Sequence, residues 1–143
     1  MIYKISSPVS IVIPRKTKKD GVIAFNLNVY RNTHFHVLND IKIRYKELIL
    51  PQLNNLPVFK YVHTVEYVWY PQRNNHSDVA NVCCIVDKFF CDALVESNHL
   101  KDDNHDYLRQ VVYRFGSVDR TNPRIDIYIH GDINEDSDQS AGN

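Results

Sequence analysis

The sequence has no net charge, no long apolar run and only three cysteines, and each shortage excludes a class of protein. No stretch approaches the roughly 18 to 20 consecutive apolar residues of a membrane span, so we expect no membrane partner. The amino terminus has no long apolar stretch ahead of a small-residue cleavage site, so no export signal is predicted. The composition, 43% hydrophobic and 24% charged, is typical of a soluble domain, and we expect a cytoplasmic protein.

The three cysteines, Cys83, Cys84 and Cys91, all lie in one predicted helix. An odd number of cysteines in one helix suits neither a disulfide framework nor a zinc site built from Cys-x-x-Cys pairs. We interpret them as small buried apolar residues, with a redox or metal role as the alternative.

The zero net charge conceals two halves of opposite sign. Residues 1–73 hold eleven Lys and Arg against four Asp and Glu, a net charge of +7, and residues 74–143 carry −7. The basic half could therefore bind an anion, and the acidic half could bind a cation. The alternative is that the halves interleave in space and their charges cancel.

At 143 residues the chain is long enough for one hydrophobic core, so we expect a single domain over residues 1–130 and a disordered acidic tail over 131–143. The element order predicts an α+β fold, a small mixed β-sheet flanked by two main helices. The patterns predict strands at 9–14, 22–29, 58–70, 107–115 and 124–130, a polar loop at 30–33, a helix from Asn39 that ends or bends at Pro51, and a helix over 78–98. Strand 58–70 is expected to be central, because it is dense in Val, Tyr and Trp.

The second predicted helix carries the chemistry. Its apolar arc consists of Val82, Val86, Phe89, Phe90 and Ala93. Asn81, Lys88 and Asp92 form one stripe beside this arc, Asp78 precedes the helix, and Asp102-Asp103 follows it. Carboxylates beside a lysine are typical of sites that hold Mg²⁺ for phosphate chemistry.

Each of these residues also has a purely structural interpretation. Asp78 is a good helix N-cap, and Lys88 with Asp92 is a common ion pair on a helix surface. Asp102-Asp103-Asn104 is ordinary turn chemistry, and Asn98 is a plausible left-handed residue at the helix end.

Three segments carry a resemblance to a known family: Asp78-x-x-Asn81, Lys88-x-x-x-Asp92-Ala93-Leu94 and Asp102-Asp103. They resemble the RusA-type family of phage and prophage Holliday junction resolvases, whose members show Asp-x-Asp-Asn, Lys-x-x-x-Asp-Ala-Leu and Asp-Asp in this order. The resemblance covers about residues 58–130 and implies a RusA-like fold. For a phage-encoded member, the compartment would be the host cytoplasm.

The resemblance implies a homodimeric endodeoxyribonuclease that cuts branched DNA such as four-way junctions, in recombination and repair, with Mg²⁺ as cofactor or Mn²⁺ as its substitute. Asp78, Lys88 and Asp103 would be the catalytic residues. Asp78 and Asp103 would hold the metal, with Asp102 as the nearest further ligand and Asp87 as the next, and Lys88 would offset charge on the phosphate. From charge alone, we expect the DNA backbone to be contacted by Lys16, Lys18, Lys19, Arg31 and Arg73.

The sequence departs from the family pattern at two places. Ala80 stands where the family has its second Asp, and four additional residues separate Asn81 from Lys88. Four residues are close to one helical turn, so Lys88 keeps nearly the same face as Asn81. The missing carboxylate leaves open an alternative function, a catalytically impaired protein of the same fold that binds DNA junctions without cutting them.

Two further readings concern aromatic residues and histidines. His34 and His36 could begin a zinc site with His63 or His76 as third ligand, because residues two apart in a strand share a face. Four aromatic residues of the predicted central strand could stack on DNA bases, although their density favours a core or dimer face: Tyr61, Tyr67, Trp69 and Tyr70.

Overall fold

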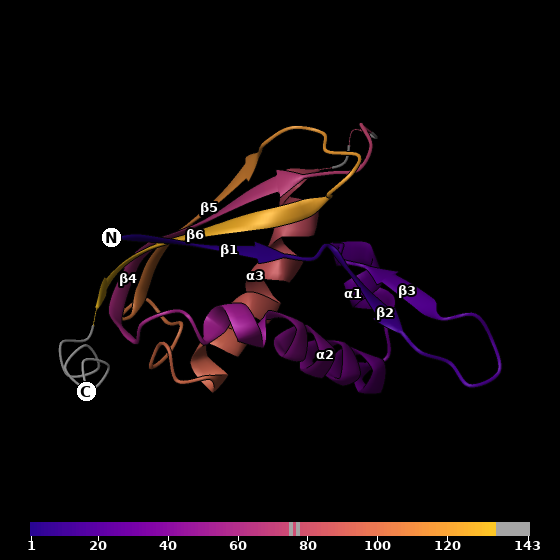
Figure 1. Cartoon of the computed structure of the whole chain (residues 1–143), viewed down its shortest axis with the longest axis horizontal. Helices are drawn as coiled ribbons and strands as arrows, with labels where there is room; N and C mark the ends of the chain where they lie inside the picture. The colour runs from indigo at the N-terminus through magenta and orange to yellow at the C-terminus, as the bar shows by residue number, and fades with distance from the viewer. Residues whose placement is uncertain (75, 77, 134–143) are drawn as a thin grey trace.

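The computed structural model describes residues 1–74, 76 and 78–133. These residues form a four-stranded mixed sheet, a separate two-stranded sheet and three helices, which confirms the predicted α+β class (Figure 1). The elements are β1 (Ile2–Ser7), β2 (Ser10–Ile13), β3 (Gly21–Ala24), α1 (Leu27–Asn32), α2 (Phe35–Leu53), β4 (Phe59–Tyr70), α3 (Val79–Glu96), β5 (Leu108–Phe115) and β6 (Arg124–Ile133). None of the helices in this part of the chain combines the length and apolarity that a membrane span requires.

The larger sheet has the strand order β1-β6-β4-β5. β4 and β5 are parallel, joined by the crossover helix α3, and the other neighbours are antiparallel. The predicted central strand, β4, is indeed an inner strand. The sheet is therefore mixed because a helix separates β4 from β5 in sequence.

The two long helices α2 and α3 pack on the same face of the sheet (Figure 1). The predicted apolar arc of α3 is buried: Val82, Val86, Phe89, Phe90 and Ala93. α2 buries one residue per turn at Ile41, Tyr45, Ile49 and Leu53. One core thus lies between the sheet and these helices, and two of the three cysteines, Cys83 and Cys91, belong to it as interpreted.

The amino-terminal third differs most from the prediction. β1 was not predicted, because it is an edge strand with only Ile5 and Ser7 fully buried. The predicted strand over 22–29 ends at Ala24, and the predicted loop over 30–33 is mostly helix α1. The Asn26 side chain accepts a hydrogen bond from Val29 N–H at 2.9 Å and caps this helix, which overrides the β propensity of the segment.

Two boundaries also move. α2 begins at Phe35 rather than Asn39, because the His34 ring accepts a hydrogen bond from His36 N–H and caps the helix earlier. Pro51 lies inside the last turn of α2. The predicted tail boundary at 130/131 is too early, since 131–133 pair with β4 as part of β6. The prediction of disorder for 134–143 lies outside the described residues.

Candidate functional site

Charged side chains from α2, α3 and the loop after α3 gather around a pocket of about 240 Å³ beside β5. The predicted residues Lys88, Asp92 and Asp103 line it together with Asp87 and Lys42. The rest of the wall consists of Tyr30, Cys91, Leu108 and Val111. We call this the lysine–aspartate pocket. It brings together two of the three predicted catalytic residues, Lys88 and Asp103.

A tight turn after α3 places Asp103 at the pocket. Asn98 has a φ of 64°, the left-handed conformation predicted for it, so the chain reverses direction there. The Asp102 carboxylate then accepts hydrogen bonds from Asp103 N–H at 2.8 Å and from Asn104 Nδ2 at 2.9 Å. Both oxygens of Asp102 are thus used inside the turn, which supports the structural interpretation of this residue.

The charges around the pocket are crowded. The pKa of Asp103 is raised, first by partial burial against the pocket wall, then by its hydrogen bond to Asp102 and the negative charges of Asp102 and Asp92. Asp92 pairs with Lys42 of α2 at 3.8 Å, and the Lys88 ammonium lies 5.7 Å from the centre of the Tyr30 ring. Lys88 therefore contacts α1, and Asp92 contacts α2.

Asp87 forms the polar floor of the pocket. It accepts hydrogen bonds from the hydroxyls of Tyr67 at 2.6 Å and Tyr113 at 2.8 Å, and from the Cys91 thiol at 3.2 Å. Burial, followed by the nearby negative charges, raises the pKa of all three donors, so they stay protonated at neutral pH. These hydrogen bonds connect α3 to β4 and β5. Asp87 therefore has a structural role, and its oxygens are not available to bind a metal.

The other half of the predicted motif lies at the opposite end of α3. Asp78 occupies the N-cap position and is exposed, and its side chain makes no capping hydrogen bond. Asn81 accepts a hydrogen bond from Leu27 N–H at 3.2 Å and so joins α3 to α1. The 18 residues of α3 extend about 27 Å at a rise of about 1.5 Å per residue, and Asp92, beside Asp103, lies near its far end. The structure thus separates Asp78 from Asp103.

The ligand set for magnesium does not fit within one chain. Among the described residues, no three His, Cys, Asp or Glu side chains form a group that could hold a metal ion. Asp78 is remote, Asp102 and Asp87 are engaged in hydrogen bonds, and Ala80 offers no oxygen.

The predicted DNA-contacting residues fall in three places. Lys16, Lys18 and Lys19 lie in the loop that joins β2 to β3, and Figure 1 shows this loop projecting at one end of the molecule. Arg31 is in the last turn of α1. Arg73 follows β4 and lines a second pocket, of about 230 Å³, together with Asn81. All five side chains are exposed.

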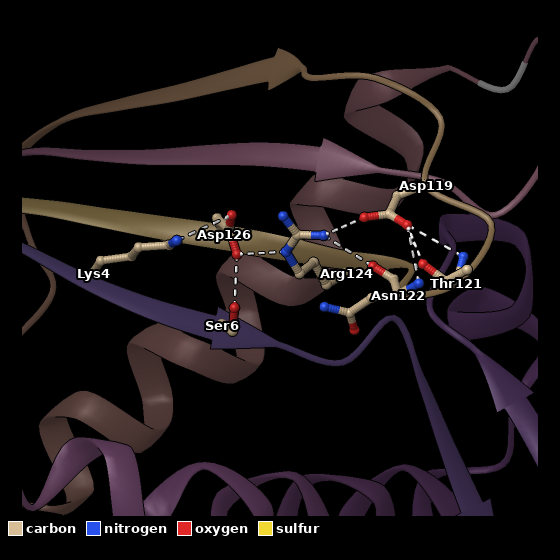
Figure 2. Close-up of polar contacts among 7 residues, drawn as sticks. All are labelled: Lys4, Ser6, Asp119, Thr121, Asn122, Arg124 and Asp126. Atoms are coloured by element: carbon tan, nitrogen blue, oxygen red, sulfur yellow. Dashed lines mark hydrogen bonds and ion pairs between the residues drawn. The ribbon is translucent and has the colours of Figure 1, made fainter.

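A buried carboxylate on the sheet face opposite the helices was not predicted. Figure 2 shows Asp126 of β6 between Lys4, Ser6 and Arg124. Its side chain is 2% exposed, and it accepts hydrogen bonds from Ser6 Oγ at 2.7 Å and Arg124 Nε at 3.1 Å. Lys4 Nζ lies 3.6 Å away, and Arg124 also binds Asp119 at 2.9 Å. The sequence offered one signal, the alternation of polar and apolar residues in β6. This alternation predicts the face of the sheet on which Asp126 lies, but it does not predict which residues bind its carboxylate.

The zinc interpretation assumed that His34 and His36 share one face of a strand, but both lie at the start of α2. The described residues also contain no group of three side chains that could hold a metal ion. Of the aromatic residues proposed for base stacking in β4, Tyr67 and Trp69 belong to the core, as the alternative reading holds. The Arg124 guanidinium covers Tyr70, 4.3 Å from the ring centre.

Comparison of the chain with models of protein families and with curated proteins yields no match.

Proposed function

We propose that this chain is a RusA-like protein that binds branched DNA, with four-way junctions as its substrate class. The observation that carries the proposal is the basic loop between β2 and β3. It places Lys16, Lys18 and Lys19, together with Arg15, on a projecting and exposed segment. Ammonium and guanidinium groups in this setting bind DNA phosphates and release condensed counterions.

Two further observations support DNA as the ligand. None of the three lysines is paired with an acidic side chain within the described residues, so their charges are available to a ligand. The order of the motif residues along α3 and the following turn resembles that of junction resolvases. Because the set of metal ligands is incomplete, we propose that the principal activity is binding of branched DNA without cleavage.

Cleavage is the second candidate, and the lysine–aspartate pocket favours it. The raised pKa of Asp103 reflects a site where carboxylates are crowded and partly desolvated, and a bound cation would relieve this crowding. Lys88, on the same pocket, would attract a phosphate. The acidic ligands that would complete a metal site would still have to come from outside this group.

One assay separates the two candidates. Purified protein is incubated with a synthetic four-way junction and with a linear duplex of the same arms, with and without Mg²⁺ or Mn²⁺. We expect a shifted junction complex with or without metal, weaker duplex binding, and intact strands. Metal-dependent cutting that Asp103→Asn abolishes would establish the nuclease instead, and a protein that binds neither substrate contradicts both candidates.

The homodimer that the resemblance implies would pair two β5 strands. β5 is an edge strand that pairs only with β4 within the described residues, and Val111 and Phe115 on it are 40% and 48% exposed. The other edge, β1, is protected: the Gln52 side chain binds both the N–H and the carbonyl of Ser6 at 2.9 and 2.8 Å. We therefore propose that a second copy adds to the sheet at β5.

The variant Val111→Lys is expected to convert a dimer of twice the 16.8 kDa chain mass into a monomer. In an antiparallel pair of β5 strands, the two new lysines would face each other near the strand centre, where like charges repel. Sedimentation equilibrium measures the mass. Ile2→Lys is the control, because Ile2 is an exposed apolar residue of the β1 edge, 62% exposed against 40% for Val111, and this variant should leave the dimer intact. A wild type that sediments as a monomer rules the arrangement out.

A further inference from the structure

The turn between α1 and α2 exposes a cluster of three rings, His34, Phe35 and His36. Phe35 is 66% exposed, and both histidines are exposed. Their centroids lie 4.7 Å apart for His34 and Phe35, 5.0 Å for His34 and His36, and 3.9 Å for Phe35 and His36. The interplanar angles are 27°, 28° and 38°. The rings therefore form a compact aromatic surface open to solvent.

The fold does not use this surface. Phe35 lies in the first turn of α2, six residues ahead of Ile41, the first buried residue of this helix, so the first turn contributes no fully buried side chain to the core. Burial of a phenylalanine side chain is worth about 1.5–3 kcal/mol, so an exposed one forgoes a substantial stabilisation. Val37, the next apolar residue of the helix, is also 37% exposed, which extends the patch along the first turn.

Basic residues lie close to the ring cluster in sequence and at the same end of the molecule. Arg31, in the last turn of α1, precedes the cluster by three positions and is exposed. The start of α2 and the basic loop between β2 and β3 lie at the same end of the molecule (Figure 1). Asp40, an acidic residue of the same helix, is occupied by Arg44 at 3.0 Å. An aromatic surface beside positive charge suits a ligand that combines a flat π-system with phosphates.

We propose that the ring cluster formed by His34, Phe35 and His36 stacks on an unpaired base of bound DNA. This inference rests on the proposed function and adds to it: the basic loop holds phosphates, and the ring cluster selects strands with unstacked bases. Fully paired duplex offers no free base face, whereas a single strand or the centre of an open junction does. Stacking of this kind tolerates any base, because each has a π-face.

The test compares Phe35→Ala with Leu48→Ala, a control at a residue of the same helix that is 58% exposed. The probes are a short oligothymidylate and a linear duplex, measured by fluorescence anisotropy. We expect Phe35→Ala to weaken oligothymidylate binding about 5- to 150-fold and to leave duplex binding unchanged. Leu48→Ala should bind both probes as the wild type does.

A second variant reports stacking directly. Trp69, the single tryptophan, is only 7% exposed, so Phe35→Trp adds an accessible fluorophore to a nearly constant background. Oligothymidylate should quench the added emission, and duplex should not.

Three results each overturn the inference: oligothymidylate affinity that is unchanged in Phe35→Ala, affinity for both probes that falls equally in this variant, or Phe35→Trp emission that is not quenched in the saturated complex. Junction binding by the wild type would still support the proposed function in each case. Wild-type protein that binds neither probe nor a junction fails at the proposed function itself.

Discussion

Replacement of Lys16, Lys18 and Lys19 together by alanine is expected to weaken junction binding on the order of 1000-fold at about 0.1 M salt. Each lysine that neutralises a phosphate releases counterions, which contributes roughly one order of magnitude to the affinity under these conditions. The loop carries no core residue, since its side chains are exposed from Pro14 to Asp20. The fold should therefore survive the three substitutions.

The salt dependence of binding is the sharper measurement. Loss of three phosphate contacts should reduce the slope of log K against log salt by about 3. The matched control neutralises three exposed basic residues near the opposite end of β4 and β5, Lys60, Lys101 and Arg109. This control removes the same charge from the protein. If both triple variants lose the same affinity, net charge rather than the loop attracts the DNA, and the proposed contact surface is wrong.

The variant Asp126→Ala is expected to lower the free energy of unfolding by about 3 kcal/mol and the midpoint by roughly 10 °C. The substitution removes the carboxylate on which Lys4, Ser6 and Arg124 converge. The side chain is 2% exposed, so bulk water has little access to this position. What remains is a set of donors oriented toward an apolar methyl group, together with a small cavity.

Asp119→Ala is the control for this prediction. Asp119 binds the same arginine at 2.9 Å, but its carboxylate is 32% exposed and lies in a loop. Water can replace it, so we expect a much smaller loss of stability. Urea denaturation of the two variants gives both free energies; equal losses would mean that the Arg124 contacts, rather than the buried position of Asp126, stabilise this face of the sheet.

Neither stability variant is expected to change DNA binding directly. The Asp126 network lies on the sheet face opposite the helices, whereas the basic loop and the ring cluster lie at the end where α2 begins (Figure 1). A folded Asp126→Asn variant, which keeps an acceptor for Ser6, should therefore bind a junction as the wild type does.

The sequence by itself determined the elements whose signals are local. The β-branched and aromatic run of β4, the apolar arc of α3 and the left-handed turn at Asn98 each follow from neighbouring residues, and each was predicted. The amino-terminal third was not, because β1 is an edge strand with few buried residues, and the α1 segment has β propensity that its Asn26 cap and its packing against α3 override.

Only the tertiary structure decided which chemical groups meet. The resemblance to the resolvase family implied that Asp78 and Asp103 act together, yet Asp103 lies beside Asp87 and Asp92, about 14 to 21 Å along α3 from Asp78. Lys88 and Asp103 do meet, because the turn at Asn98 returns the chain beside α3. The partners of Asp87 and Asp126 come from strands distant in sequence, and such convergence depends on how the strands are ordered in the sheet, which no local pattern encodes.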